Sequence, residues 1–192
     1  MKKHNISKTL ILLATASLLI FNACKKHDDD HKHDDHDHDN ELITTVRLQF
    51  VDSLSKDTFN YTWSQPKGPG SAVSIDTIGL EADRVYLASV DLLDKSKNPA
   101  VSVSEAILAD ANSHRFIYTS SLAGTQIRIL DFDQQVPAME LGLKFRFFAA
   151  NTGTGNFICK LRHYTASSPK SGGLANGSTD IEVEFPIVLI RK

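Results

Sequence analysis

The densest chemistry in this sequence lies in a tract of histidine and aspartate near the N-terminus. Residues 27–39 hold five histidines, seven aspartates and no apolar side chain, and successive histidines stand two to four positions apart. Neutral imidazole is a favoured ligand of Zn, Cu and Ni, and carboxylates attract cations and can complete a coordination sphere. We therefore predict a labile Zn, Cu or Ni site whose ligands come from His27, His31, His33, His36, His38, Asp34, Asp37 and Asp39.

The same composition predicts that residues 24–40 form a solvated tether, because they contain almost nothing that a core could bury. Ordering a flexible chain around an ion costs roughly 1–2 kcal/mol per residue fixed. Weak and exchangeable binding is therefore expected, which suits a collector or relay of ions better than a catalytic centre. The alternative is a spacer that only holds a domain away from a membrane. A spacer needs polarity but not imidazole, so the five histidines favour metal binding.

The segment before this tract has the features of an export signal. A positively charged start is followed by a mostly apolar run over residues 10–21, which at ~1.5 Å per residue is too short to cross a hydrocarbon core of ~30 Å. The next residues, Phe-Asn-Ala-Cys at 21–24, resemble the lipobox of bacterial lipoproteins. This resemblance implies a signal peptide over residues 1–23 and a lipid on Cys24 that attaches the protein to a membrane. An ordinary secretory signal with an incidental cysteine is the alternative.

The count of two cysteines supports lipidation. If Cys24 carries lipid, Cys159 has no intramolecular partner and the exported domain has no disulfide. The competing hypothesis is a Cys24–Cys159 bridge, but we expect Cys159 to be a small buried hydrophobe without chemistry. Residues 25–30 also resemble the acid-rich signal of some Gram-negative lipoproteins, which implies an outer-membrane lipoprotein on the periplasmic or cell-surface face.

The rest of the chain, residues 41–192, has balanced charge, with 16 acidic and 15 basic side chains. That balance offers no basic stripe of the kind that binds phosphate backbones, so we expect no nucleic-acid partner. No G-x-S-x-G, H-E-x-x-H or Walker motif occurs, and Gly153-Thr-Gly155 lacks the third glycine of a dinucleotide fingerprint. We therefore expect a binding protein rather than an enzyme, with no organic cofactor.

Two histidines of this body, His114 and His163, stand at the ends of predicted strands. If those strands end at the same pole, the two imidazoles could form a second, preorganised metal site with Asp110, Asp180 or Glu182. The alternative is a pair of half-exposed histidines in a sheet, without any ligand. Only the pairing of the strands decides between these two interpretations.

Alternation of apolar and polar side chains predicts that the body consists of strands. The pattern is clear around 46–50 and 59–63, and further strands are predicted over 72–78, 84–93, 114–119, 125–132, 141–149, 155–164 and 180–190. One short helix is predicted over 103–110, with Ser104 as its N-cap. Residues 141–149 and 155–164 are expected to form a hairpin, and Pro186 is expected at a sheet edge or a bulge.

About eight to nine strands and one helix predict an all-β domain over residues 41–192, an antiparallel β-sandwich of immunoglobulin-like or Greek-key type. The order of elements resembles small immunoglobulin-like lipoprotein domains of outer membranes. It also resembles a group of His/Asp-tethered lipoproteins associated with TonB-dependent metal receptors, which implies a role in metal uptake beside an outer-membrane receptor. A different class of function is a metal-independent sandwich that holds a glycan, peptide or protein partner in loops 65–70 and 165–178.

Overall fold

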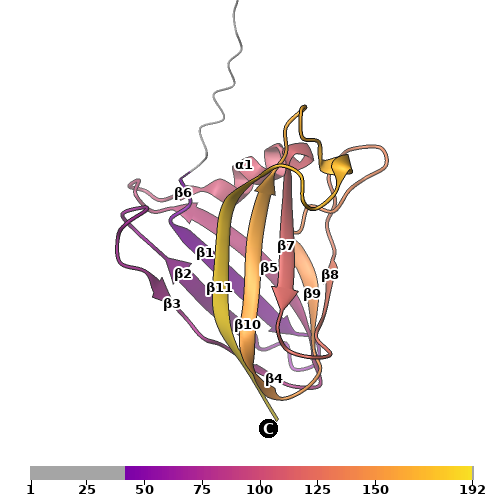
Figure 1. Ribbon diagram of the computed structural model, residues 1–192. Helices are drawn as coiled ribbons and strands as arrows, with labels where there is room; N and C mark the ends of the chain where they lie inside the picture. Colours follow the sequence, from indigo (N-terminus) through magenta and orange to yellow (C-terminus); the bar gives the residue numbers. More distant parts are fainter. Residues whose placement is uncertain (1–41, 192) are drawn as a thin grey trace, which may run out of the picture. The chain divides into compact units, whose positions relative to one another are not determined.

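The structure is a computed structural model, and it describes residues 42–191 (Figure 1). The predictions for the signal peptide, the lipid on Cys24 and the His/Asp tract lie outside the described residues. The described chain has eleven strands in two sheets and one short α-helix. The predicted all-β sandwich class is therefore confirmed, with more strands than the eight to nine expected.

The two sheets form the layers of the sandwich. The first has the order β3-β2-β1-β5-β9-β8, with β6 paired to β5: β1 (Thr45–Asp52), β2 (Thr58–Ser64), β3 (Ser74–Ile75), β5 (Arg84–Asp94), β6 (Val101–Ser102), β8 (Gln126–Ile129) and β9 (Lys144–Ala149). The second has the order β4-β11-β10-β7: β4 (Ile78–Glu81), β7 (His114–Ser120), β10 (Gly153–His163) and β11 (Ser178–Ile190). All pairings are antiparallel except that of β4 with β11, which is parallel.

Aromatic side chains from both layers fill the core. Alternation puts every second residue of a strand on the inner face, and Phe50 of β1 is fully buried there. Its ring lies 5.6 Å from that of Phe147 in its own sheet and 6.2 Å from that of Phe157 in the other, measured between centroids. These edge-to-face contacts join the two sheets into one core.

The predicted hairpin of 141–149 with 155–164 is wrong. β9 pairs with β5 and β8, whereas β10 pairs with β11 and β7. The intervening link therefore crosses from one sheet to the other, and the apolar faces of the two strands meet across the core. The rings of Phe145 and Phe157 lie 6.1 Å apart in this contact. Alternation identifies the apolar face of each strand but does not distinguish a neighbour in the sheet from a partner in the opposite layer.

Two smaller expectations also change. The strand predicted over 72–78 divides into β3 and the start of β4, which belong to different sheets. Pro186 lies in β11 just before Ile187, where the pairing with β4 begins. Up to that point β11 is an edge strand, so a residue without an N–H group is tolerated there as expected.

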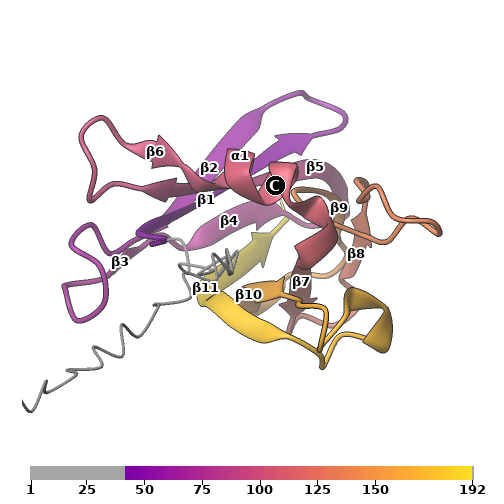
Figure 2. The same cartoon turned by 90° about the horizontal axis from the view of Figure 1, so that it is seen from above.

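The predicted helix is present as α1 (Val103–Ala109), followed by the 3₁₀ helix η1 (Ala111–Ser113). Its N-cap is Ser102 rather than Ser104, because the Ser102 hydroxyl accepts a hydrogen bond from the backbone N–H of Glu105. The Ser104 hydroxyl instead accepts a hydrogen bond from the backbone N–H of Leu92, and this bond connects the helix to β5. Figure 2 looks onto this end of the sandwich and shows α1 beside β5 and the start of β7. No helix in the described part of the chain is long and apolar enough to span a membrane.

The sandwich thus has two ends of different construction (Figure 1). We call the first the α1 end, where α1 and η1 lie beside the start of β7 and the end of β10. We call the second the β4 end, where β4 meets the end of β1 and the start of β5. Antiparallel pairing puts the end of β10 and the end of β11 at opposite ends of the second sheet, so the two regions are separated by the length of the strands.

Candidate functional site

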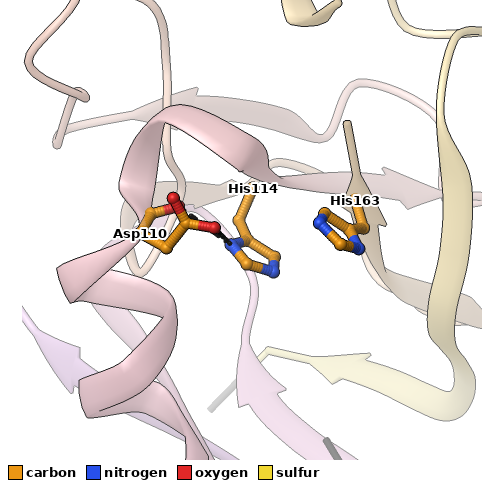
Figure 3. Close-up of side chains that lie close together, drawn as sticks. All are labelled: Asp110, His114 and His163. Carbon is orange, nitrogen blue, oxygen red and sulfur yellow. Dashed lines mark hydrogen bonds and ion pairs between the residues drawn. The ribbon is translucent and has the colours of Figure 1, made fainter. Parts of the chain in front are cut away.

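The two histidines of the body meet at the α1 end. The register of β7 with β10 places His163 directly opposite His114. His163 is 7% exposed, and the His114 side chain is 15% exposed. Both lie in phase with the buried residues of their strands, so they belong to the inner face. Their rings stack with centroids 4.8 Å apart and planes 11° from parallel. Figure 3 shows the two rings side by side, with Asp110 on the other side of His114. The start of β7 and the end of β10 therefore lie at the same end of the sandwich, and neither histidine is half-exposed.

The hydrogen bonding of His114 identifies its tautomer. Its Nδ1 lies 2.9 Å from the backbone carbonyl oxygen of Asp110. A carbonyl oxygen can only accept, so Nδ1 carries the proton, and Nε2 is the acceptor atom of the neutral ring. The Asp110 carboxylate is on the same side, 3.8 Å from Nδ1. Histidines that bind metals commonly donate their other N–H to a backbone carbonyl in this way. Asp110 therefore orients the His114 ring and leaves Nε2 for a ligand.

A β-bulge brings Asp180 to this pair. In the register of β10 with β11, Leu161 faces Ile181 but the next residue, Arg162, faces Thr179. Asp180 is the extra residue on β11 and has no counterpart on β10 among the described strands. A bulge re-aims side chains and bends the strand locally. Here it puts a carboxylate near His114 on the inner side of the sheet.

Asp180 is a buried carboxylate with incomplete hydrogen bonding. Its side chain is 9% exposed, and Oδ2 lies 3.9 Å from Nε2 of His114. Oδ1 is buried and has no hydrogen-bond partner among the described residues. Burial raises the pKa of Asp180 above its ordinary value, although electrostatic interactions with His163, His114 and Arg162 oppose the shift. An unsatisfied buried carboxylate oxygen is costly, and a bound cation would relieve that cost.

Asp110, His114 and His163 are the one group within residues 42–191 whose possible ligand atoms all lie within 4.8 Å of one another. Asp180 approaches His114 to 3.9 Å but is not in this group, so it must move closer to His163 to complete a site with both imidazoles. Two imidazoles and a carboxylate suit Zn, Ni or Cu rather than Ca or Mg, which prefer oxygen. The lone pairs of an imidazole lie in the ring plane, so two parallel stacked rings do not aim at a single point. Binding one ion at ~2.0–2.1 Å from both rings therefore requires one imidazole to rotate.

A buried ion pair holds the loops around the site. The Lys170 ammonium, in the 3₁₀ helix η2 (Lys170–Gly172), donates to Asp133 at 2.8 Å and to the carbonyl of Ala111 at 3.1 Å. The side chains of Lys170 and Asp133 are 1% and 0% exposed. Burial alone would raise the pKa of Asp133, but hydrogen bonds from Lys170 and from two backbone amides hold it below its ordinary value. Because Ala111 begins η1, this pair fixes the segment that leads into His114.

The loop before β11 packs directly on the end of β10. The Arg162 guanidinium donates to the carbonyls of Asn176 and Gly177 at 2.6 Å each. Gly177 has φ +75°, and a Cβ at this position would lie 2.1 Å from the carbonyl oxygen of His163. Only glycine fits such a position without movement. The backbone of His163 is therefore tightly enclosed by this loop.

The structure separates the other predicted residues from this group. Glu182 pairs with Lys160 at 2.7 Å on the outer face, so it is not part of the histidine cluster. Cys159 is 1% exposed, and burial raises the pKa of its thiol far above the ordinary value. The expectation that Cys159 is buried is confirmed. The Lys170–Asp133 pair was missed, because a lysine in a Ser-Pro-Lys-Ser-Gly-Gly loop is typical of solvated surface.

The cluster of His114, His163 and Asp180, with Asp110 behind it, has the composition of an ion-binding site. Beside it, the Ser113 hydroxyl donates a hydrogen bond to the Asp110 carboxylate at 3.1 Å. Comparisons with protein-family models, with curated proteins and with solved structures found no match to this chain. The functional argument therefore rests on the geometry of these side chains.

Proposed function

We propose that this protein binds transition-metal ions at the α1 end of its β-sandwich, through Nε2 of His114, the imidazole of His163 and the carboxylate of Asp180. One observation carries the proposal. A buried carboxylate, whose Oδ1 has no hydrogen-bond partner within residues 42–191, stands beside two stacked imidazoles. Asp110 serves as the group that orients His114, through its backbone carbonyl.

The charge and the chemistry of the cluster both favour a divalent ion such as Zn²⁺. An ionised Asp180 and two neutral imidazoles carry a single negative charge in a poorly solvated place, and a divalent cation compensates it. Nitrogen ligands select Zn, Ni or Cu over the alkaline-earth ions. Three protein ligands leave one position of a tetrahedral site for water or for an exchanging ligand. Such a site suits reversible transfer of an ion.

The role of the whole chain follows from its N-terminal sequence. Lipid on Cys24 would anchor the protein to the outer membrane, and the five histidines of the tract would collect Zn, Cu or Ni near that surface. The β domain would then hold an ion at higher affinity than the tract, because its ligands are already ordered and the ordering cost of a flexible chain is avoided. An accessory role in metal uptake beside an outer-membrane receptor is consistent with this division.

Calorimetric titration of the detergent-solubilised full chain with Zn²⁺ tests the proposal. One variant replaces all five tract histidines with Asn, and a second combines His114→Asn with His163→Asn. We expect the second variant to lose a tight site of one ion per chain and the first to lose only weaker binding. Asp91→Asn, which removes an exposed carboxylate on the outer face paired with Arg47, is the matched control and should change nothing. Equal heats from all four proteins would contradict the proposal.

The dependence on pH provides a second readout. Free imidazole protonates near a pKa of ~6.5, and only the neutral ring binds a metal. Zinc binding should therefore decline below about pH 6. Binding that persists unchanged at pH 5 would show that carboxylates alone hold the ion.

The anchor can be tested separately. If cleavage occurs before Cys24, the remaining chain carries 18 basic and 23 acidic side chains, so anionic head groups repel it and attachment must come from acyl chains. Membrane association should therefore resist high salt and yield to detergent. Cys24→Ser should abolish acylation, as measured by intact mass. Wild-type protein recovered without lipid would contradict the lipobox interpretation.

A further inference from the structure

A cavity of about 400 Å³ opens at the β4 end, on the far side of the sandwich from the histidine cluster. Its volume lies within the range of small-molecule sites, roughly 300–1,000 Å³. The end of β1, the start of β2 and the start of β5 form one wall, and β4 with the end of β11 forms the other. The cavity thus has lining residues from both sheets at this end of the sandwich. The metal-site proposal uses none of its residues.

Two aromatic rings form part of the wall. Phe59 of β2 and Tyr86 of β5 are in edge-to-face contact, with centroids 6.2 Å apart. The Tyr86 hydroxyl bonds to the backbone of Glu81, at 2.9 Å from its nitrogen and 3.2 Å from its oxygen. Burial raises the pKa of this hydroxyl, so it stays a neutral phenol. Phe59 is only partly buried and supplies apolar and π surface, whereas Tyr86 is 1% exposed and supports the Phe59 ring, with its polar atom already satisfied.

Charged side chains stand around this aromatic wall. Asp52, Asp57 and Glu81 contribute carboxylates, and Arg84 is the one cation among the described lining residues. Arg84 approaches Glu81 only to 3.4 Å and Asp52 only to 3.8 Å, distances longer than those of strong charged hydrogen bonds. Three carboxylates against one guanidinium leave an excess of negative charge. The cavity is therefore complementary to a positively charged ligand.

The spacing of the carboxylates decides which kind of cation fits. Among residues 42–191, the group with metal-ligand proximity is at the α1 end and includes none of these three acids. Their oxygens therefore form no compact set of ligands for one inorganic ion, and no imidazole lies among the described lining residues. An organic cation presents several N–H donors and an apolar body, which dispersed carboxylates and aromatic rings can bind together.

We propose that this cavity binds a small organic cation, in which a primary ammonium or guanidinium group is attached to an apolar body. The cationic group faces Asp57 and Glu81, and the apolar body lies against Phe59, whose ring Tyr86 supports. Asp52 has a different role, because its Oδ1 already accepts the amides of Leu54 and Ser55 and shapes the turn after β1. The site does not depend on metal binding.

Titration of the full chain with phenethylammonium, followed by ligand-detected NMR in one fixed detergent, tests this inference. The neutral analogue 2-phenylethanol has nearly the same shape and should bind at least about tenfold more weakly. Asp57→Asn combined with Glu81→Gln should weaken phenethylammonium binding about tenfold, and Phe59→Leu about fivefold. Asp91→Asn removes an exposed carboxylate elsewhere and should leave the affinity unchanged.

Three results would overturn the inference. The first is equal affinity for the amine and the alcohol, which would mean that charge has no part in binding. The second is an equal affinity of the double variant and of Asp91→Asn, provided that circular dichroism shows both to be folded. The third is the absence of saturable binding to the wild-type chain.

Discussion

The α1 end and the β4 end both place charged groups beside the core, but they compensate those charges differently. At the α1 end, Lys170 and Asp133 are completely buried and closely hydrogen-bonded, whereas Asp180 keeps an oxygen without a hydrogen-bond partner among the described residues. At the β4 end, Arg84 makes only long contacts to its carboxylates around an open cavity. The tightly bonded ion pair therefore stabilises the fold. The carboxylates with incomplete hydrogen bonding or long ion-pair contacts lie where a ligand can bind.

The largest effect is expected from breaking the tight pair. Lys170→Met leaves Asp133 buried without its partner and should destabilise the domain by about 3–5 kcal/mol. Urea unfolding followed by circular dichroism measures this free energy. The double variant Lys170→Met with Asp133→Leu should regain much of the lost free energy of unfolding, because it leaves no buried charge without a partner. At the β4 end, Arg84→Met should cost less than about 1 kcal/mol. Similar losses at Lys170 and Arg84 would remove the distinction between the two ends.

A smaller effect is expected from the loop that packs on His163. Gly177→Ala combines a positive φ with a collision against the His163 carbonyl, and should cost about 1–3 kcal/mol. Gly173→Ala, in the same loop, also has a positive φ, but its Cβ would meet no atom of the described chain within 4 Å. The difference in unfolding free energy between the two variants isolates the contact with His163. Zinc affinity should fall only for Gly177→Ala, and an equal fall for both would contradict the role of this packing.

A change in stability of the opposite sign is expected at Asp180. Because burial raises the pKa of Asp180 in the folded protein, the folded state retains a proton that the unfolded state has released. Stability is therefore lost as pH rises from the unfolded pKa of ~3.9 through the folded value, and the ionised side chain is unfavourable at pH 7. Asp180→Asn should stabilise the metal-free protein by about 1 kcal/mol at pH 7 and weaken zinc binding.

Two measurements check the Asp180 account. Unfolding at pH 7 and at pH 3 should show the gain at neutral pH and its disappearance in acid. Asp57→Asn at the β4 end is more exposed and should change stability little at either pH. A variant at Asp180 that is less stable than the wild type without zinc would show that this carboxylate supports the fold rather than a ligand.

The strands themselves could be predicted from the sequence more readily than the pairing of one strand with another. Alternation identified the strands that carry Phe145 and Phe157, because an inner face has a period of two in either layer. It did not show that these rings meet across the core, since a neighbouring strand and an opposing strand have the same pattern. The His114–His163 pair was foreseen only as one of two possibilities. Choosing between them required the register of β7 with β10, which depends on the whole sheet.

The β-bulge at Asp180 and the Lys170–Asp133 ion pair were harder still to predict from the sequence. The bulge at Asp180 arises from a one-residue mismatch between β10 and β11, and neither strand has a glycine at that point to indicate it. Lys170 and Asp133 are 37 positions apart in two loops, and residues of loops are ordinarily solvated. Their burial depends on how three loops pack together at the α1 end.

The central claim is that the β domain itself holds a transition-metal ion, and zinc K-edge absorption tests it most directly. The sample is the full chain with all five tract histidines replaced by Asn, loaded with one equivalent of Zn²⁺ and dialysed. We expect retained zinc with two imidazole nitrogens and further oxygen ligands at about 2.0–2.1 Å. Adding His163→Asn should reduce the imidazole count to one and release most of the zinc. Loss of all zinc before that substitution, or a spectrum that His163→Asn does not change, would contradict the account.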